Sequence, residues 1–260
     1  MAPQPGEINP AEQTIVAFIG RKKGGKSKLA RHMAADYPYD QVHVDLHGDD
    51  RPPELGMQNS GVVELTEVPT RWPEHLRPEG RPLVLYYQPD AGSPTLIQDM
   101  DAAAGLAWRH GRCLLIVHEW GALALTHNQR ERPFTSRVLS QGRKRQVSLF
   151  LLMHRPHNID GLTLVQADIV SCFEIPKRAD RERIADDIGW DLADLEAALE
   201  ELPRWGYLLY DRRIPPPGPG EQDLRLTSWP PLSEEELGEL ERGPAPTDHY
   251  AGDFQTTSAG

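Results

Sequence analysis

The sequence predicts an α/β fold in which a mostly parallel central sheet is covered by helices on both faces. Two observations support this prediction. Short apolar segments alternate with longer helical or irregular segments along the 260 residues, and a glycine-rich turn joins the first apolar segment to a helical one. The apolar segments expected as strands are 14–19, 41–46, 83–87, 113–117, 148–153, 169–175 and 206–210. The segments expected as helices are 26–35, 94–109, 133–142, 178–188 and 191–202, the last with Asp191 as its N-cap.

The chain divides into three parts around this core. Residues 1–11 are expected as a flexible N-terminus, 12–231 as one domain, and 232–260 as an acidic, largely disordered tail. The tail holds seven acidic residues and one arginine, so −6 of the net charge of −11 lies there. Within the domain, the segment 52–80 is rich in proline, glycine and charge and is expected as a long connection. Two further segments are candidates for short strands, 61–65 and 224–229.

The turn between the first predicted strand and the first predicted helix has the pattern G-x-x-x-x-G-K-S, from Gly20 to Ser27. Glycines at such a turn let backbone N–H groups converge on phosphate oxygens, and the helix N-terminus adds a partial positive charge. Lys26 is placed to reach the β- and γ-phosphates, and the Ser27 hydroxyl to ligate Mg²⁺. A basic loop whose glycines serve only a turn is the simpler alternative, but it does not explain a Lys-Ser pair where the helix begins. The residues expected to bind nucleotide are Gly20, Lys23, Gly24, Gly25, Lys26, Ser27 and Lys28.

The predicted strand 113–117 is apolar throughout and ends in His118 and Glu119. Ligands of parallel sheets bind at the carboxyl ends of the strands, so Glu119 is expected to polarise an attacking water. In P-loop hydrolases with an extra strand, this run ends in Asp-Glu, and His118 stands where the metal-supporting Asp is expected. Mg²⁺ is then supported by Ser27, water and Asp45 at the end of the neighbouring strand. Whether His118 joins the metal shell or only packs stays open.

Two later segments add candidate residues. His154 follows the apolar strand 148–153, where a polar side chain can contact the γ-phosphate, although a lone histidine often has only a structural role. Arg143, Lys144 and Arg145 form a basic cluster before the same strand, which is either a surface facing DNA or another subunit, or a solvated loop.

These motifs together resemble the HerA/FtsK superfamily of DNA-pumping ATPases. The resemblance runs over about residues 12–210. It includes the glycine-rich turn Gly20–Ser27, called the P-loop from here on, and the segments Leu115–Glu119, Gly142–Ser148 and His154–Pro156. His154 stands where the family has Gln. The resemblance implies the three-layer P-loop NTPase fold of the RecA-like (ASCE) class, with ATP and Mg²⁺ as ligands. Among compact members, the chain is most similar to the genome-packaging ATPases of tailless, membrane-containing phages and viruses.

The resemblance also implies an activity and partners. It implies an ATP-hydrolysing motor that translocates double-stranded DNA as a homo-oligomeric ring of five or six subunits, docked on a capsid or membrane protein at a portal vertex. In such rings an arginine of the next subunit completes the catalytic site, and Arg143 and Arg145 are the candidates here. A non-motor ATP-dependent switch, a Zot-like phage assembly ATPase and a small-molecule kinase are the alternatives.

Composition excludes several other classes. No apolar run approaches 18 residues, so no transmembrane segment is expected, and the N-terminus does not have the pattern of a signal peptide. Cys113 and Cys172 lie in strand-like segments and are expected as buried apolar residues, which fits a reducing cytoplasm. The net charge does not exclude DNA as a partner, because more than half of it lies in the tail.

Overall fold

The computed structural model describes residues 6, 8–9, 12–35, 37–48, 51, 61–121, 132–156, 161–218 and 223–233. The predicted acidic tail beyond residue 233 and the part 52–60 of the predicted long connection lie outside these residues. Of the predicted flexible N-terminus, Gly6 and Ile8 are described: the Gly6 amide donates to Asp211, and Ile8 packs against the core.

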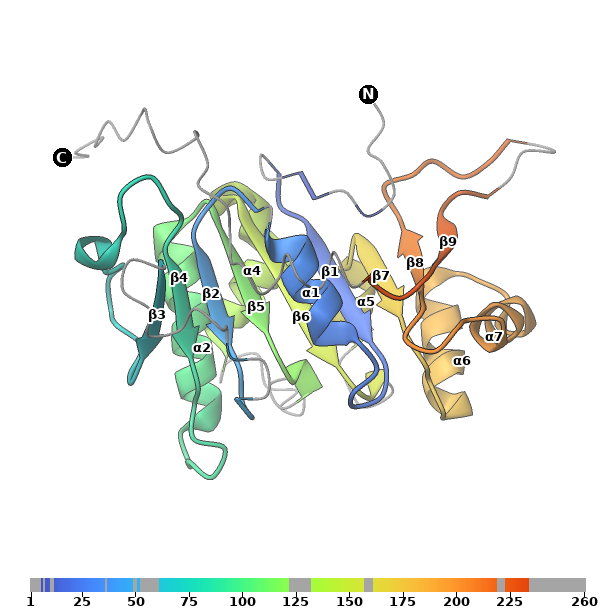
Figure 1. Cartoon of the computed structure of the whole chain (residues 1–260), viewed down its shortest axis with the longest axis horizontal. Coiled ribbons are helices and arrows are strands. Elements are labelled where there is room, and N and C mark those ends of the chain that lie inside the picture. The colour runs from blue at the N-terminus through green and yellow to red at the C-terminus, as the bar shows by residue number, and fades with distance from the viewer. Residues whose placement is uncertain are drawn as a thin grey trace.

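All described strands belong to one nine-stranded sheet of order β3-β4-β2-β5-β6-β1-β7-β8-β9 (Figure 1). The strands from β3 to β7 pair in parallel, whereas β8 and β9 are antiparallel at one edge. This architecture confirms the predicted α/β fold with a mostly parallel sheet. The strands are β1 (Ile15–Ile19), β2 (Gln41–Val44), β3 (Val62–Leu65), β4 (Val84–Tyr87), β5 (Cys113–Val117), β6 (Val147–Met153), β7 (Ile169–Cys172), β8 (Tyr207–Asp211) and β9 (Leu226–Trp229).

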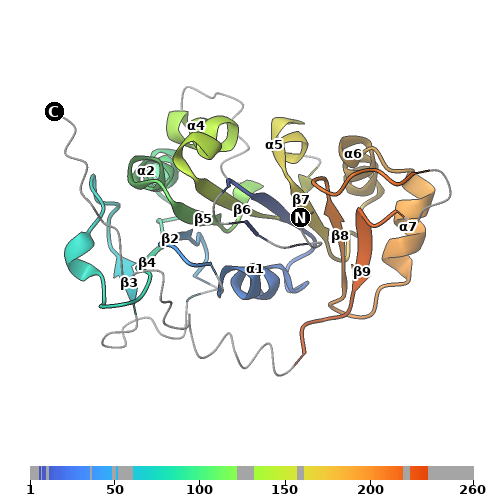
Figure 2. The ribbon, with the colours of Figure 1, turned by 90° about the horizontal axis from the view of Figure 1, so that it is seen from above.

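Helices cover both faces of the sheet, and the apolar residues of the strands alternate between them. Figure 2 shows α2, α4, α5 and α6 on one face and α1 on the other, with α7 beside the β8 edge. In β1, Ile15, Ala17 and Ile19 join the core of the first face, and Val16 and Phe18 join that of the second. The helices are α1 (Lys26–Ala35), α2 (Leu96–His110), α4 (Pro133–Gln141), α5 (Gly161–Gln166), α6 (Arg178–Ile188) and α7 (Leu192–Glu200), with 3₁₀ turns η1 (Glu74–Leu76) and η2 (Gly142–Arg145).

Two strands, β2 and β7, end earlier than the predicted segments 41–46 and 169–175, because the following backbone groups bond elsewhere. β2 ends at Val44, since the Asp45 carboxylate accepts hydrogen bonds from the His47 and Gly48 amides and turns the chain. β7 ends at Cys172, and the Glu174 carbonyl beyond it accepts from the Arg21 amide of the glycine-rich turn. Strand ends are therefore set by contacts that the local sequence does not show.

A buried polar cluster joins the chain before β2 to α2 and to the connection before β4. The Asp40 carboxylate is buried and accepts from the Arg77 guanidinium, from the Leu83 amide at 2.8 Å, and lies 2.9 Å from His110 Nε2. The Trp72 ring stacks on His110 with centroids 3.9 Å apart. Burial alone raises the pKa of Asp40, but the hydrogen bonds from His110, Arg77 and Leu83 outweigh it and hold this pKa below its ordinary value.

Candidate nucleotide-binding site

The glycine-rich turn lies between β1 and α1, and close approach by the chain after β7 explains its glycines. A Cβ on Gly20 would lie 2.7 Å from the Phe173 Cβ, and a Cβ on Gly24 would lie 3.0 Å from the Arg21 carbonyl oxygen. Gly25 has φ +106, a conformation that residues with a side chain rarely adopt. The turn can therefore keep its shape only with glycine at these positions. Its backbone leads directly into the N-terminus of α1, as an anion site requires.

Lys26 is the cation inside this turn. Its side chain is buried, and Nζ donates to the Gly20 and Arg21 carbonyls at 2.9 Å each. Nζ also lies 3.0 Å from His154 Nδ1, at the carboxyl end of β6. The ammonium group is thus held between the turn and the neighbouring strand, where the charge of a bound phosphate would meet it.

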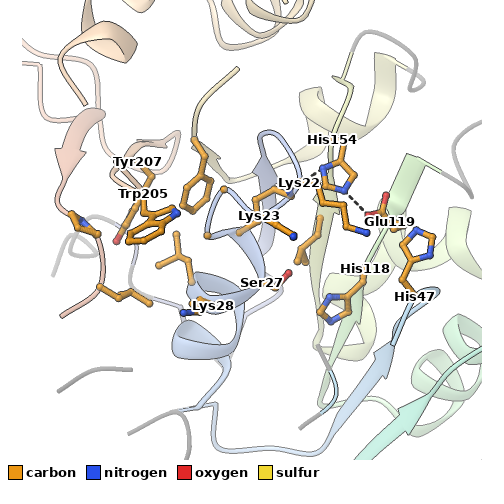
Figure 3. Close-up of a pocket in the computed structure, with 18 of the residues that line it drawn as sticks. Lys22, Lys23, Ser27, Lys28, His47, His118, Glu119, His154, Trp205 and Tyr207 are labelled. Carbon is orange, nitrogen blue, oxygen red and sulfur yellow. Dashed lines mark hydrogen bonds and ion pairs between the residues drawn. The ribbon is translucent and has the colours of Figure 1, made fainter. Parts of the chain in front are cut away.

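His154 joins Lys26 to Glu119. Its Nε2 lies 2.5 Å from Glu119 Oε1, and Figure 3 shows the imidazole beside the carboxylate at one end of the pocket. β6 lies between β1 and β5 in the sheet, so a side chain at its end reaches both neighbours. Glu119 has φ +62, a left-handed conformation that is uncommon for glutamate and recurs at active sites. The structure therefore brings three of the predicted catalytic residues together.

The charge of Glu119 follows from its surroundings. Burial raises the pKa of Glu119, but the hydrogen bond from His154 and the positive charges of His154, His47 and Lys26 outweigh burial and lower it below the ordinary glutamate value. At neutral pH this side chain is an ionised carboxylate. It can accept a proton from a water molecule but has none to give.

The site opens into a pocket of about 880 Å³. Figure 3 shows Trp205 and Tyr207 on one side of the P-loop lysines, and His47, His118, Glu119 and His154 on the other. Five lining residues were not predicted, because each lies in or beside an ordinary strand and has no local motif: His47, Phe173, Trp205, Tyr207 and Leu232. The residues that line the pocket are Lys22, Lys23, Gly24, Gly25, Lys26, Ser27, Lys28, Leu29, Asp45, His47, His118, Glu119, Leu152, His154, Phe173, Trp205, Tyr207, Pro231 and Leu232.

The donors at the β2 and β5 ends fit a magnesium ion held partly by phosphate. Ser27, Asp45 and His118 all line the pocket. The Asp45 carboxylate accepts from the Tyr86 hydroxyl at 2.8 Å, which orients it at the end of β2. Magnesium prefers oxygen ligands, which favours Ser27 and Asp45 over the His118 imidazole. Within the described ranges, no three His, Cys, Asp or Glu side chains form a complete metal site.

The basic cluster 143–145 lies just before the amino end of β6, at the opposite end of this strand from His154. It forms the 3₁₀ turn η2 rather than an extended entry to the strand, and Gln146, at φ +54, ends the turn. The Arg145 guanidinium donates to the Trp108 and Arg109 carbonyls at 3.1 and 2.7 Å, at the end of α2. Arg145 is thus engaged within its own subunit. The proposed trans role of Arg143 and Arg145 stays a prediction.

Two smaller expectations concern cysteines and membrane segments. Cys113 and Cys172 are both free and buried, as predicted. Among the described helices, none has the length and apolar character needed to cross a bilayer.

Comparison with known proteins gives a structural likeness only. No protein-family model matches the sequence, and no curated protein matches it. The genome packaging NTPase B204 from Sulfolobus turreted icosahedral virus 2, in complex with sulfate, superposes with a TM-score of 0.61 and 18% identity over 87% of this chain and 99% of that one. B204, the DNA-packaging ATPase from Sulfolobus turreted icosahedral virus, superposes with a TM-score of 0.60 and 17% identity, over 87% of this chain and 100% of that chain.

A secretion ATPase shares the same arrangement. The cytoplasmic domain of the type VII secretion ATPase EccC from Thermomonospora curvata has a TM-score of 0.51 and 15% identity, over 90% of this chain but 28% of that one. Identities this low establish a common fold and leave activity to be argued from the site. The glycine-rich turn, the sheet order and these likenesses together show that the chain has the P-loop NTPase fold, which it shares with B204 over 87% of its length.

Proposed function

We propose that this chain hydrolyses ATP at the pocket formed by the P-loop, Glu119 and His154. The observation that supports this most directly is the continuous contact from Lys26 through His154 to Glu119. It joins a phosphate-binding cation to an ionised carboxylate through one imidazole. A site that only bound phosphate would not need a carboxylate there, because negative charge near the anion opposes binding.

Each residue then has a role in phosphoryl transfer to water. Lys26 and the turn amides neutralise charge on the β- and γ-phosphates, and Glu119 orients the attacking water and accepts its proton. His154 contacts the γ-phosphate from the end of β6 and transmits its presence or loss to Glu119. Ser27 and Asp45, with His118 beside them, would hold Mg²⁺, which supplies further positive charge at the phosphates.

We further propose that hydrolysis drives translocation of double-stranded DNA, in viral genome packaging. The support is that the shared fold covers 87% of this chain and 99–100% of the B204 packaging NTPase. On this proposal residues 12–231 form the motor domain of a homo-oligomeric ring of five or six subunits in the cytoplasm. The ring docks on a capsid or membrane protein at a virion vertex.

The test is ATP turnover with and without linear double-stranded DNA, in the wild type and two variants. Lys26→Ala should lose ATP binding, and Glu119→Gln should keep binding while turnover falls by about 10²–10⁴-fold, since a glutamine cannot accept the proton of water. Glu182→Gln is the matched control, because this carboxylate is exposed and pairs only with Arg178 on α6. Wild-type turnover should rise when DNA is added.

Two outcomes would contradict the proposal in different ways. Normal hydrolysis by Glu119→Gln would remove the assigned base. Wild-type turnover that DNA does not change would favour the second candidate, a non-motor ATP-dependent switch. That candidate would be favoured specifically if the hydrogen bond from His154 to Glu119 Oε1 persisted with ATP bound, because it engages one of the two oxygens that could orient water.

A further inference from the structure

The pocket has two chemically different ends. Glu119, His154 and Asp45 follow β5, β6 and β2, whereas Figure 3 shows Trp205 and Tyr207 on the opposite side of the P-loop. Phe173 and Leu232 pack in one apolar cluster with Tyr207, and Pro231 also lines the pocket: the five residues are Phe173, Trp205, Tyr207, Pro231 and Leu232. We call these last five residues the aromatic end. Among the described lining residues the only carboxylates are Asp45 and Glu119, so the aromatic end has neither a carboxylate nor a side-chain amide.

Trp205 presents its ring at this end in a conformation that tryptophan rarely adopts. The Gly206 amide donates to the Pro203 carbonyl at 2.9 Å and closes a turn in which Trp205 has φ +66. Glycine or asparagine is the usual residue where a turn needs positive φ, and a bulky residue there is strained. The side chain is nevertheless 53% exposed, so burial of the indole does not explain why it is there.

The rings around Trp205 form a surface next to the P-loop. The Phe173 and Tyr207 centroids are 5.3 Å apart, and the Tyr207 ring is parallel to that of Trp229 at 6.3 Å. A Cβ on Gly25 would lie 3.1 Å from the Phe173 ring and 3.9 Å from the Trp205 carbonyl oxygen. The phosphate-binding turn is therefore in direct contact with the aromatic end.

We propose that the aromatic end binds the purine base of the nucleotide by stacking on Trp205, and that it accepts adenine and guanine with similar affinity. The proposal rests on the proposed function, because the phosphates must lie in the P-loop for the base to reach Trp205. Stacking on an aromatic ring tolerates any base, since every base has a π face. Discrimination between adenine and guanine needs several polar groups placed against the base edge, and the polar side-chain atoms of this end are the Trp205 indole N–H and the Tyr207 hydroxyl, with no carboxylate or amide.

The experiment measures binding by calorimetry, with Mg²⁺, of ATP, GTP, UTP and inorganic tripolyphosphate. Trp205→Ala should weaken the binding of ATP and of GTP by about tenfold, as expected for the loss of one stacking contact. It should leave the affinity for tripolyphosphate unchanged. Trp205→Phe should retain most of the affinity because it keeps a ring. Leu224→Ala is the control, an exposed apolar residue outside the pocket. In the wild type, ATP and GTP should differ by less than about fivefold, and UTP should bind more weakly because its ring is smaller.

Several results would overturn the inference while leaving the proposed function intact. One such result is that Trp205→Ala binds ATP with unchanged affinity while Lys26→Ala no longer binds tripolyphosphate. Another is equal weakening of tripolyphosphate and ATP in Trp205→Ala, since the tryptophan would then act by shaping the P-loop. A preference of the wild type for ATP over GTP beyond about fiftyfold would refute base tolerance. If tripolyphosphate and ATP both fail to bind the wild type, the proposed function itself fails and the inference fails with it.

Discussion

At the scale of single residues, Trp205 combines an exposed ring with a strained backbone, and the two properties can be separated by substitution. Glycine at 205 removes the ring and relieves the left-handed strain, whereas alanine removes the ring and keeps the strain. A residue with a Cβ costs about 1–2 kcal/mol in this conformation. We therefore expect the free energy of unfolding of Trp205→Gly to be about 1 kcal/mol higher than that of Trp205→Ala. Both variants lose the contact with the base.

Urea unfolding followed by circular dichroism checks this prediction, with the wild type in the same buffer. Because glycine also loosens the unfolded chain, the gain is expected to be smaller than the full strain. A glycine variant less stable than the alanine variant would show that position 205 carries no strain in solution.

His154 and His118 stand where the resemblance expects Gln and Asp, and the structure explains only the first. An imidazole has nitrogens on two sides, so His154 reaches Lys26 with one and Glu119 with the other. His118 is buried at the end of β5 and lies parallel to His43, with centroids 6.3 Å apart. The structure shows no reason for an imidazole rather than a carboxylate at position 118.

At the scale of elements, the Asp40 cluster is the junction between the β2 and β4 strands and the end of α2. Asp40→Asn should lower the free energy of unfolding at pH 7 by about 3 kcal/mol, because it removes the buried carboxylate that the largely buried Arg77 guanidinium bonds, while the exposed Glu74 still accepts from Arg77 at 3.0 Å. The pKa of Asp40 is lower in the folded protein than its ordinary value near 4, so the carboxylate stabilises the fold above that value. This stabilisation is lost as the pH falls through the lowered pKa.

Urea unfolding of the wild type and Asp40→Asn between pH 7 and pH 3 measures the effect. The difference between the two should be constant above about pH 5 and shrink below about pH 4. Asp90→Asn is the control, since Asp90 is exposed and bonds only within its own turn, to the Gly92 amide. A difference that grows as the pH falls would contradict the assigned charge.

How far the sequence predicts these elements depends on whether a feature is local. The P-loop and Glu119 could be predicted from local sequence. The P-loop is a short run of consecutive residues after an apolar strand, and Glu119 stands at the end of another apolar strand. Helix α5 was missed, since Gly161–Gln166 is only six residues long. Trp205 was missed for a different reason, since its turn has tryptophan where glycine is usual. In addition, Trp205 lies beside the pocket because β8, which follows it, pairs with β7, and the local sequence does not show this pairing.

At the scale of the whole molecule, the proposed ring makes different predictions for two neighbouring arginines. Arg145 holds the end of α2, so Arg145→Ala should lower the free energy of unfolding by about 1 kcal/mol. Arg143 is exposed, and its backbone is held by two hydrogen bonds: its amide donates to Gln13 Oε1 at 2.8 Å and its carbonyl accepts from the Gln146 amide at 3.3 Å. If Arg143 completes the neighbour's site, Arg143→Ala should keep ATP binding and stability while turnover falls on the order of 10³-fold.

Light scattering of the assembly and ATPase assays of mixed subunits test this pair of predictions. Arg143→Ala mixed with Glu119→Gln should recover some turnover, because one interface then combines an intact arginine with an intact glutamate. Lys144→Ala is the matched control on the same turn. A monomer with full activity at every concentration would exclude both the ring and the trans arginine.

The strand order also has a consequence for how the chain folds. β2, β3, β4 and β5 are neighbours in the sheet and close together in sequence, whereas β1 lies between β6 and β7, and Thr14 bonds to Ser148, 134 residues away. Contacts of such high sequence separation form late, because a long loop must close before they do. The glycine-rich turn is thus synthesised well before the strands that flank it in the sheet. The apolar strand β1 that precedes it must stay unpaired until β6, which begins more than a hundred residues later, has also been synthesised.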